Sequence, residues 1–136
     1  MNEIYFLDTS YIIALEIVNE DRHQSVLANW LTLSRSRPFL VTTTYIFDEV
    51  VTFFNSRGLQ RKAVEIGDRL LNSPDIELIE IDRDLFDLGW QYFQKYDDKS
   101  YSFTDCLSFI VMEQRAIAVA LTLDHHFLQA GFQKRP

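Results

Sequence analysis

Three aspartates whose carboxylates could bind a metal ion stand beside predicted strands and helices. Asp8 directly follows the uninterrupted apolar run Ile4–Leu7, and Asp124 follows the apolar run 117–123. Such runs are typical of strands that a parallel sheet buries on both faces. Open α/β sheets bind ligands outside the carboxyl ends of their strands, where the strand order reverses. Asp8 and Asp124 should therefore share one crevice if their strands are neighbours.

Hydroxyl residues accompany these acids. The third aspartate, Asp105, is predicted in the first turn of a helix capped by Ser102 or Thr104, where the helix dipole stabilises a negative charge. Thr9 or Ser10 is expected to cap the helix that follows the first strand, because a hydroxyl oxygen accepts a hydrogen bond from the free N–H groups there.

Helical phase selects a fourth acid. The segment 45–57 has a helical apolar stripe and is followed by Gly58, a residue that commonly ends helices. Glu49 lies at the border of the stripe, whereas Asp48 points nearly opposite. We therefore expect Glu49 to lean into the site and Asp48 to be solvated.

The chemistry that four carboxylates can support follows from their charge. Clustered carboxylates raise one another's pKa unless a cation intervenes. A hard ion such as Mg²⁺ or Mn²⁺ prefers oxygen ligands, and the chain lacks the CxxC and HxxxH spacings of zinc sites. Such an ion would polarise a phosphate and help deprotonate a water. The acids therefore predict phosphodiester hydrolysis.

The length of 136 residues predicts a single domain, residues 1–136, and 47% hydrophobic residues suffice for one core. The lone Cys106, expected to be a small core residue, and the absence of a signal peptide favour the reducing cytoplasm. No apolar run approaches the roughly 20 residues that cross a bilayer, so no membrane partner is expected.

The formal net charge of −7 argues against nucleic-acid binding by bulk electrostatics alone. An acidic nuclease remains consistent with this charge if its acids gather around cations. Arg57, Arg61 and Lys62 form the best candidate cluster for RNA contacts, and a solvated helix face is the alternative interpretation.

The elements that must position these residues alternate along the chain. Further strands are predicted at 39–44, 76–81 and near the C-terminus, with helices between them. The helix that Asp82 caps carries the large apolar residues Leu85, Phe86, Leu88, Trp90 and Phe93. Strands that alternate with helices predict a parallel α/β sheet with right-handed crossovers.

Four motifs surround the four acids: LDTSYIIAL with Asp8, DEV with Glu49, SFTDC with Asp105 and LTLDHHF with Asp124. Together they resemble the PIN-domain ribonucleases, in particular VapC-like toxins of toxin–antitoxin pairs. The resemblance implies a three-layer α/β/α fold with a five-stranded parallel sheet in the order 3-2-1-4-5. It also implies RNA cleavage with Mg²⁺ or Mn²⁺ held by the four acids, a homodimer, and a cognate antitoxin. The family often places a Ser or Thr beside its acids, as Ser10 and Thr104 stand here.

Two other functions stay open. A phosphotransfer or phosphatase-type domain could use Asp8, although such a phosphatase needs a second aspartate where Ser10 stands. A non-catalytic module that binds protein or RNA is the other. His125 and His126 are expected to be an exposed pair that starts a short helix.

Overall fold

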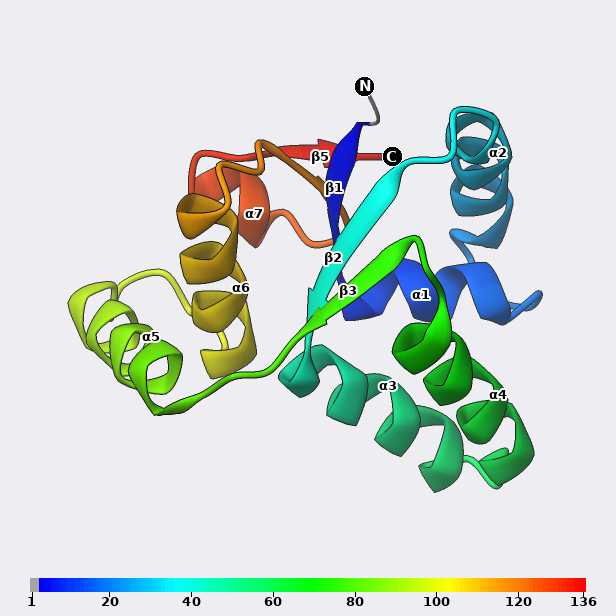
Figure 1. Cartoon of the computed structure of the whole chain (residues 1–136), viewed down its shortest axis with the longest axis horizontal. Helices are drawn as coiled ribbons and strands as arrows, with labels where there is room; N and C mark the ends of the chain where they lie inside the picture. Colours follow the sequence, from blue (N-terminus) through cyan, green and yellow to red (C-terminus); the bar gives the residue numbers. More distant parts are fainter. Residues whose placement is uncertain (1–2) are drawn as a thin grey trace.

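The computed structural model describes residues 3–136, and a five-stranded sheet runs through its middle (Figure 1). The strand order is β3-β2-β1-β4-β5 and every neighbouring pair is parallel, which confirms the predicted fold class and strand order. The strands are β1 (Ile4–Leu7), β2 (Phe39–Thr43), β3 (Ile76–Ile79), β4 (Val119–Leu121) and β5 (Gln133–Arg135).

Helices cover both faces of the sheet, because the chain winds from β1 towards β3 and then returns to β4 and β5 (Figure 1). None of the helices within residues 3–136 is long and apolar enough to cross a membrane. One side carries α1 (Thr9–Glu16), α2 (His23–Ser34), α3 (Thr44–Ser56) and α4 (Gln60–Asn72). The other carries α5 (Arg83–Lys95), α6 (Phe103–Gln114) and α7 (His126–Gln129).

The central strand β1 ends level with its neighbour β4. Leu7 pairs with Leu121, and the amide of Asp8 donates to the carbonyl of Leu121 at 3.1 Å. The chain turns one way from β1 towards β2 and the other way from β4 towards β5. The residues that follow β1 and β4 therefore emerge together at the point where the strand order reverses.

Helix α3 ends at the predicted glycine, and α4 follows it. Gly58 follows the C-cap of α3 and adopts a φ of +75°, a left-handed conformation that favours glycine. In α4 the side chains of Ala63, Ile66 and Leu70 face the core and are all buried. These helices pack against each other, and α3 begins at the same edge of the sheet where β1 ends (Figure 1).

The predicted caps of α1 are wrong. Asp8 occupies the N-cap position and makes no side-chain cap bond, while Thr9 and Ser10 are the first residues of the helix. The strand passes into the helix with no intervening turn, so the hydroxyls point to other partners. That frees both hydroxyls for hydrogen bonds between elements.

The large apolar residues of α5 are only partly covered. Phe86 is 38% exposed, Trp90 50% and Phe93 39%, and we call these three residues the aromatic face. Trp90 stacks on Phe93 with ring centroids 5.7 Å apart. The helix lies outside α6, away from the sheet, so it can bury only the side that α6 covers (Figure 1).

Helices α5 and α6 pack so closely at Gly89 that a side chain at this position would not fit. A Cβ at this position would lie 2.4 Å from Leu107 Cδ2, and Leu107 is fully buried. We expect Gly89→Ala to lower the free energy of unfolding in urea. Overpacking costs about 1–3 kcal/mol and outweighs the gain of about 1 kcal/mol in helix propensity.

Gly67→Ala in α4 is the matched control. Its Cβ would meet Phe47 Cζ at 3.3 Å, and the half-buried Phe47 ring has room to shift. This variant should be neutral or slightly stabilised. Equal changes in the two variants would contradict a close contact specific to Gly89.

Candidate active site

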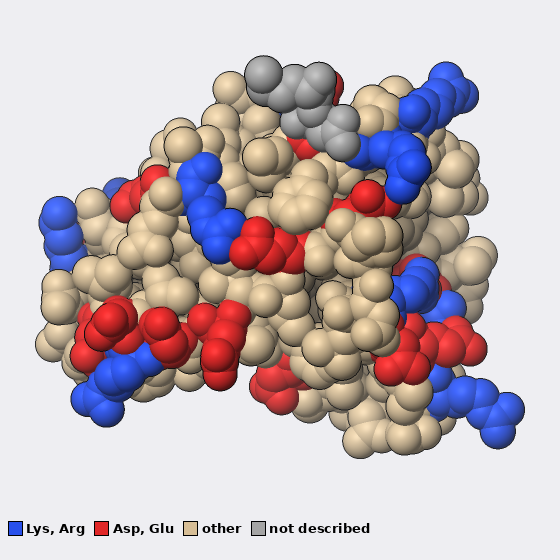
Figure 2. All heavy atoms as spheres, in the orientation of Figure 1, with Lys and Arg blue, Asp and Glu red and all other residues tan. Residues whose placement is uncertain are grey.

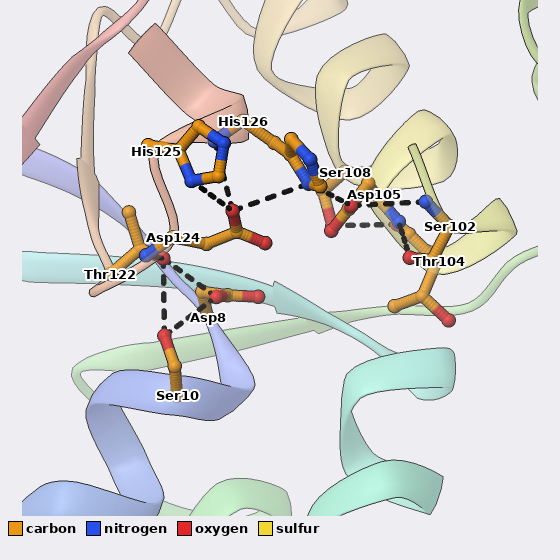
Figure 3. Close-up of polar contacts among 10 residues, drawn as sticks. All are labelled: Asp8, Ser10, Ser102, Thr104, Asp105, Ser108, Thr122, Asp124, His125 and His126. Atoms are coloured by element: carbon orange, nitrogen blue, oxygen red, sulfur yellow. Dashed lines mark hydrogen bonds and ion pairs between the residues drawn. The ribbon is translucent and has the colours of Figure 1, made fainter. Parts of the chain in front are cut away.

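The carboxyl ends of β1 and β4 face the start of α6, and three predicted acids meet there (Figure 3). Asp8 follows β1, Asp124 lies in the turn between β4 and α7, and Asp105 lies in the first turn of α6. Asp8 and Asp105 are buried, while Asp124 is half-buried. The structure thus brings together three side chains that are far apart in the sequence.

Two hydroxyls fix the Asp8 carboxylate. Asp8 Oδ2 accepts hydrogen bonds from Thr122 Oγ1 at 2.7 Å and from Ser10 Oγ at 3.0 Å (Figure 3). Burial first and the charge of Asp105 second raise the pKa of Asp8 against the lowering effect of these hydrogen bonds, to a net value of about 6. Asp8 therefore carries a charge that the surrounding protein solvates poorly.

The same hydroxyls reach the loop that carries Asp124. Thr122 Oγ1 accepts from the amide of Asp124 at 3.0 Å, and Ser10 Oγ accepts from the amide of Leu123 at 2.9 Å. Sequence reasoning missed Thr122, although it is the one polar residue in the apolar run 117–123. It links the carboxylate of one strand end to the backbone of the next.

Asp105 both starts its helix and faces the site. Ser102 Oγ accepts from the amide of Asp105 at 2.9 Å, and Asp105 Oδ2 accepts from the amide of Ser102 at 3.1 Å, so the predicted Ser102 cap is confirmed. Burial raises the pKa of Asp105; the Ser102 hydrogen bond opposes this, and the charge of Asp124 adds to it. Thr104, the other predicted cap, contributes only its carbonyl, which accepts from Ser108 Oγ.

The two histidines differ, so the expectation of an exposed pair is wrong for one of them. His125 points to solvent, with a side chain 70% exposed. His126 turns inward, and its Nδ1 lies 3.3 Å from Asp105 Oδ2 and 3.2 Å from Asp124 Oδ1. One donor atom from each of Asp105, Asp124 and His126 lies within 4.8 Å of the others, as a shared metal ion requires.

Glu49 lies at the side of this cluster. Its carboxylate is half-buried and accepts a hydrogen bond from Thr9 Oγ1 at 2.7 Å, while Asp48 is exposed. Asp48 is thus solvated as predicted, and Glu49 leans inward towards Thr9. Thr9 adjoins Asp8 in the chain, which places Glu49 on the α1 side of the cluster.

The donor set fits a hard divalent cation. Within residues 3–136, no lysine or arginine forms an ion pair with Asp8, Glu49, Asp105 or Asp124. Carboxylates that are close together, partly desolvated and without a basic partner are stabilised by an ion such as Mg²⁺ or Mn²⁺. Cys106 is buried as expected, and burial raises the pKa of its thiol to about 11, so it is no nucleophile.

The predicted RNA contacts lie at the α3–α4 junction. Lys62 Nζ binds Glu16 at 3.1 Å, and the Arg57 guanidinium lies 3.6 Å above the centre of the Phe53 ring. Arg61 is exposed. On the face of the molecule drawn in Figure 2, the basic side chains lie in several separate groups rather than in one continuous patch.

Comparison with known proteins places these features in a family context. The PIN domain model matches residues 5–133. The chain is 30% identical over 127 residues to the 23S rRNA-specific endonuclease VapC20 of Mycobacterium tuberculosis, covering 93% of this chain and 94% of that protein.

Solved structures agree with this assignment. The crystal structure of M. tuberculosis VapC20, described as a sarcin–ricin loop cleaving toxin, superposes with a TM-score of 0.86 and 30% identity, covering 98% of this chain and 100% of that one. VapBC2 from Rickettsia felis, bound to a promoter DNA fragment, gives a TM-score of 0.69 at 13% identity, with 97% of each chain covered. FitAcB from Neisseria gonorrhoeae gives 0.67 at 18% identity, covering 98% of this chain and 96% of that one. The last two show a shared fold.

The raised pKa of Asp8 predicts a pH-dependent stability in the presence of a chelator. The pKa rises from 3.8 to about 6 on folding, so ionisation opposes folding. Stability should be unaffected below about pH 4, fall between about pH 4 and pH 6, and level off above that, with a total loss of about 3 kcal/mol at 1.36 kcal/mol per pKa unit. Asp8→Asn should remove this loss and exceed wild type in urea at pH 7.5.

Asp48→Asn, at an exposed carboxylate, should follow the wild-type pH dependence. If Asp8→Asn is less stable than wild type at pH 7.5 and the gap is the same at pH 4, the buried charge is not a source of instability.

Proposed function

The chain belongs to the PIN domain family, and from this premise we propose that Asp8, Glu49, Asp105 and Asp124 make it a metal-dependent endoribonuclease. The observation that supports this is the convergence of three of these acids where β1 and β4 end and α6 begins, with no lysine or arginine partner among the described residues 3–136. Mg²⁺ or Mn²⁺, when bound, would polarise a phosphodiester and lower the pKa of a water.

The side chains of the site have different proposed roles. Asp105 and Asp124 would hold the ion, and Ser10 and Thr122 fix the Asp8 carboxylate beside them through hydrogen bonds. Glu49 offers one oxygen to Thr9 and has the other available to hold a water. Thr104 lies beside Asp105 at the start of α6 and would line the approach of the RNA.

Phosphotransfer through Asp8 fits this geometry poorly. The carboxylate is 6% exposed, and two hydroxyls already hold Oδ2. An aspartyl nucleophile must reach a phosphoryl group in line, which such burial prevents. The structure offers no observation that favours this alternative.

The substrate we propose is the sarcin–ricin loop of 23S rRNA, which would place the activity in the cytoplasm. The support is the 30% identity to VapC20 along 93% of the chain. Arg57, Arg61 and Lys62 remain our candidates for contacts to the RNA backbone. Arg57 lies two helical turns beyond Glu49, about 12 Å along the α3 axis, a distance that a folded RNA stem can span.

The partner we propose is a cognate antitoxin that inserts an apolar helix between α1, α2 and α4. A cavity of about 430 Å³ opens there, lined by residues that include Leu15, Trp30 and Ile66. Glu16 lies at the cavity and binds both Lys62 and Arg69. An apolar groove with charged groups beside it is the arrangement that amphipathic helices recognise.

A second copy of the chain is the partner we propose for the aromatic face. Three large rings on one side of α5 are 38–50% exposed and continue into Phe103 at the start of α6. Contiguous exposed rings of this size mark interaction surfaces.

Activity on RNA tests the proposal directly. We expect the purified protein with Mn²⁺ to cleave RNA and Asp124→Asn to lower the rate at least about a hundredfold, since a metal supplies several kcal/mol of transition-state stabilisation. Asp48→Asn, beside Glu49 but exposed, should retain the wild-type rate. Equal rates in wild type and Asp124→Asn would mean that the acids do not catalyse the reaction.

The choice of substrate has a separate test. A synthetic sarcin–ricin stem-loop should be cut at a single position, and a control with the same stem and a permuted loop should resist cleavage. Equal cleavage of both RNAs would support the nuclease activity and contradict the sarcin–ricin loop as its specific substrate.

A further inference from the structure

We infer that His126 supplies a nitrogen ligand to the ion held by Asp105 and Asp124, so that this site favours Mn²⁺ over Mg²⁺. This inference rests on the metal-dependent function proposed above and concerns the identity of the ion. The four acids of the sequence motifs offer only oxygen, and His126 adds a donor of another kind.

The spacing of the donor atoms carries the inference. His126 Nδ1 lies 3.3 Å from Asp105 Oδ2 and 3.2 Å from Asp124 Oδ1. Adjacent ligands of an octahedral ion bound at about 2.1 Å are about 3.0 Å apart. Both distances are thus close to the edge of a coordination octahedron. A small inward movement of the three side chains would complete it.

Hydrogen bonding alone describes these contacts less well. Charge-assisted bonds from nitrogen to carboxylate usually measure about 2.7–2.9 Å, and both distances here are longer. His126 Nδ1 also faces two carboxylates, and the contact to Asp124 does not meet hydrogen-bond geometry. One N–H cannot satisfy both acids, whereas one cation can bind all three atoms.

The position of the imidazole is set independently of any ion. The amide of His126 donates to Asp124 Oδ1 at 2.9 Å, so the ring and that oxygen belong to one turn. The rings of Tyr101 and His126 pack edge to face, with centroids 5.4 Å apart and an interplanar angle of 82°. The His126 side chain is only 19% exposed. A ligand held in place before the ion arrives loses little freedom on binding.

A nitrogen ligand changes which ion the site prefers. Mg²⁺ binds oxygen donors and keeps several waters, whereas first-row transition ions accept imidazole readily. Two carboxylates and one imidazole would leave the remaining positions of an octahedral Mn²⁺ for water and a phosphate oxygen. Loss of the imidazole should therefore weaken Mn²⁺ binding more than Mg²⁺ binding.

Pulsed electron paramagnetic resonance of the Mn²⁺-loaded protein without RNA is the test. Wild type should show the hyperfine coupling of a directly bound imidazole nitrogen. His126→Asn, which leaves an oxygen donor, should lose this coupling and lower the Mn²⁺ over Mg²⁺ preference in calorimetric titrations at least about tenfold. His125→Ala, at the exposed neighbour, should keep both.

Three results would overturn the inference. Mn²⁺ bound to wild type without nitrogen coupling would reject the His126 ligand and leave the ribonuclease proposal intact. Coupling that disappears in His125→Ala and persists in His126→Asn would assign it to the other histidine. No Mn²⁺ binding by wild type would reject the proposed metal-dependent function as well. The wild-type spectrum decides the first and last of these even if a variant fails to fold.

Discussion

Mutual repulsion among carboxylates is the constraint around which this structure is built. Asp8, Asp105 and Asp124 come from separate segments and converge where two strands end. Their partners within residues 3–136 are hydroxyls, backbone amides and imidazoles rather than lysines or arginines. Such groups orient an acid without neutralising it, so the cluster keeps its negative charge. The repulsion among these acids lowers the stability of the fold, as the charged groups of functional sites commonly do.

The parts of the fold and site that depend on local patterns could be predicted. A continuous apolar run predicts a strand that is buried on both faces of a parallel sheet. Two such runs therefore predict that the acids after β1 and β4 lie at the same edge of the sheet. Helical phase distinguished Glu49 from its neighbour Asp48 because they differ by about 100° around the α3 axis. Ser102 was recognisable as a cap because its hydroxyl lies three residues before Asp105.

Contacts that depend on strand register could not be predicted. Thr122 reaches Asp8 because Leu7 pairs with Leu121, a register that neither strand encodes alone. The two histidines separate because the turn after Asp124 directs one inward and the other outward. The sequence shows that α5 carries large apolar residues, but it does not show whether the chain's own core covers them, and most of them are exposed.

Asp105 serves two purposes, and this has a practical consequence for the choice of inactive proteins. Its carboxylate accepts the amide of Ser102, one of the two hydrogen bonds that close the first turn of α6, so replacing it by alanine removes that hydrogen bond together with a carboxylate of the site. A variant that lacks one carboxylate and keeps the start of α6 intact is better made at Asp124, which caps no long helix. An activity assay alone would otherwise mistake a frayed helix for a disabled reaction centre.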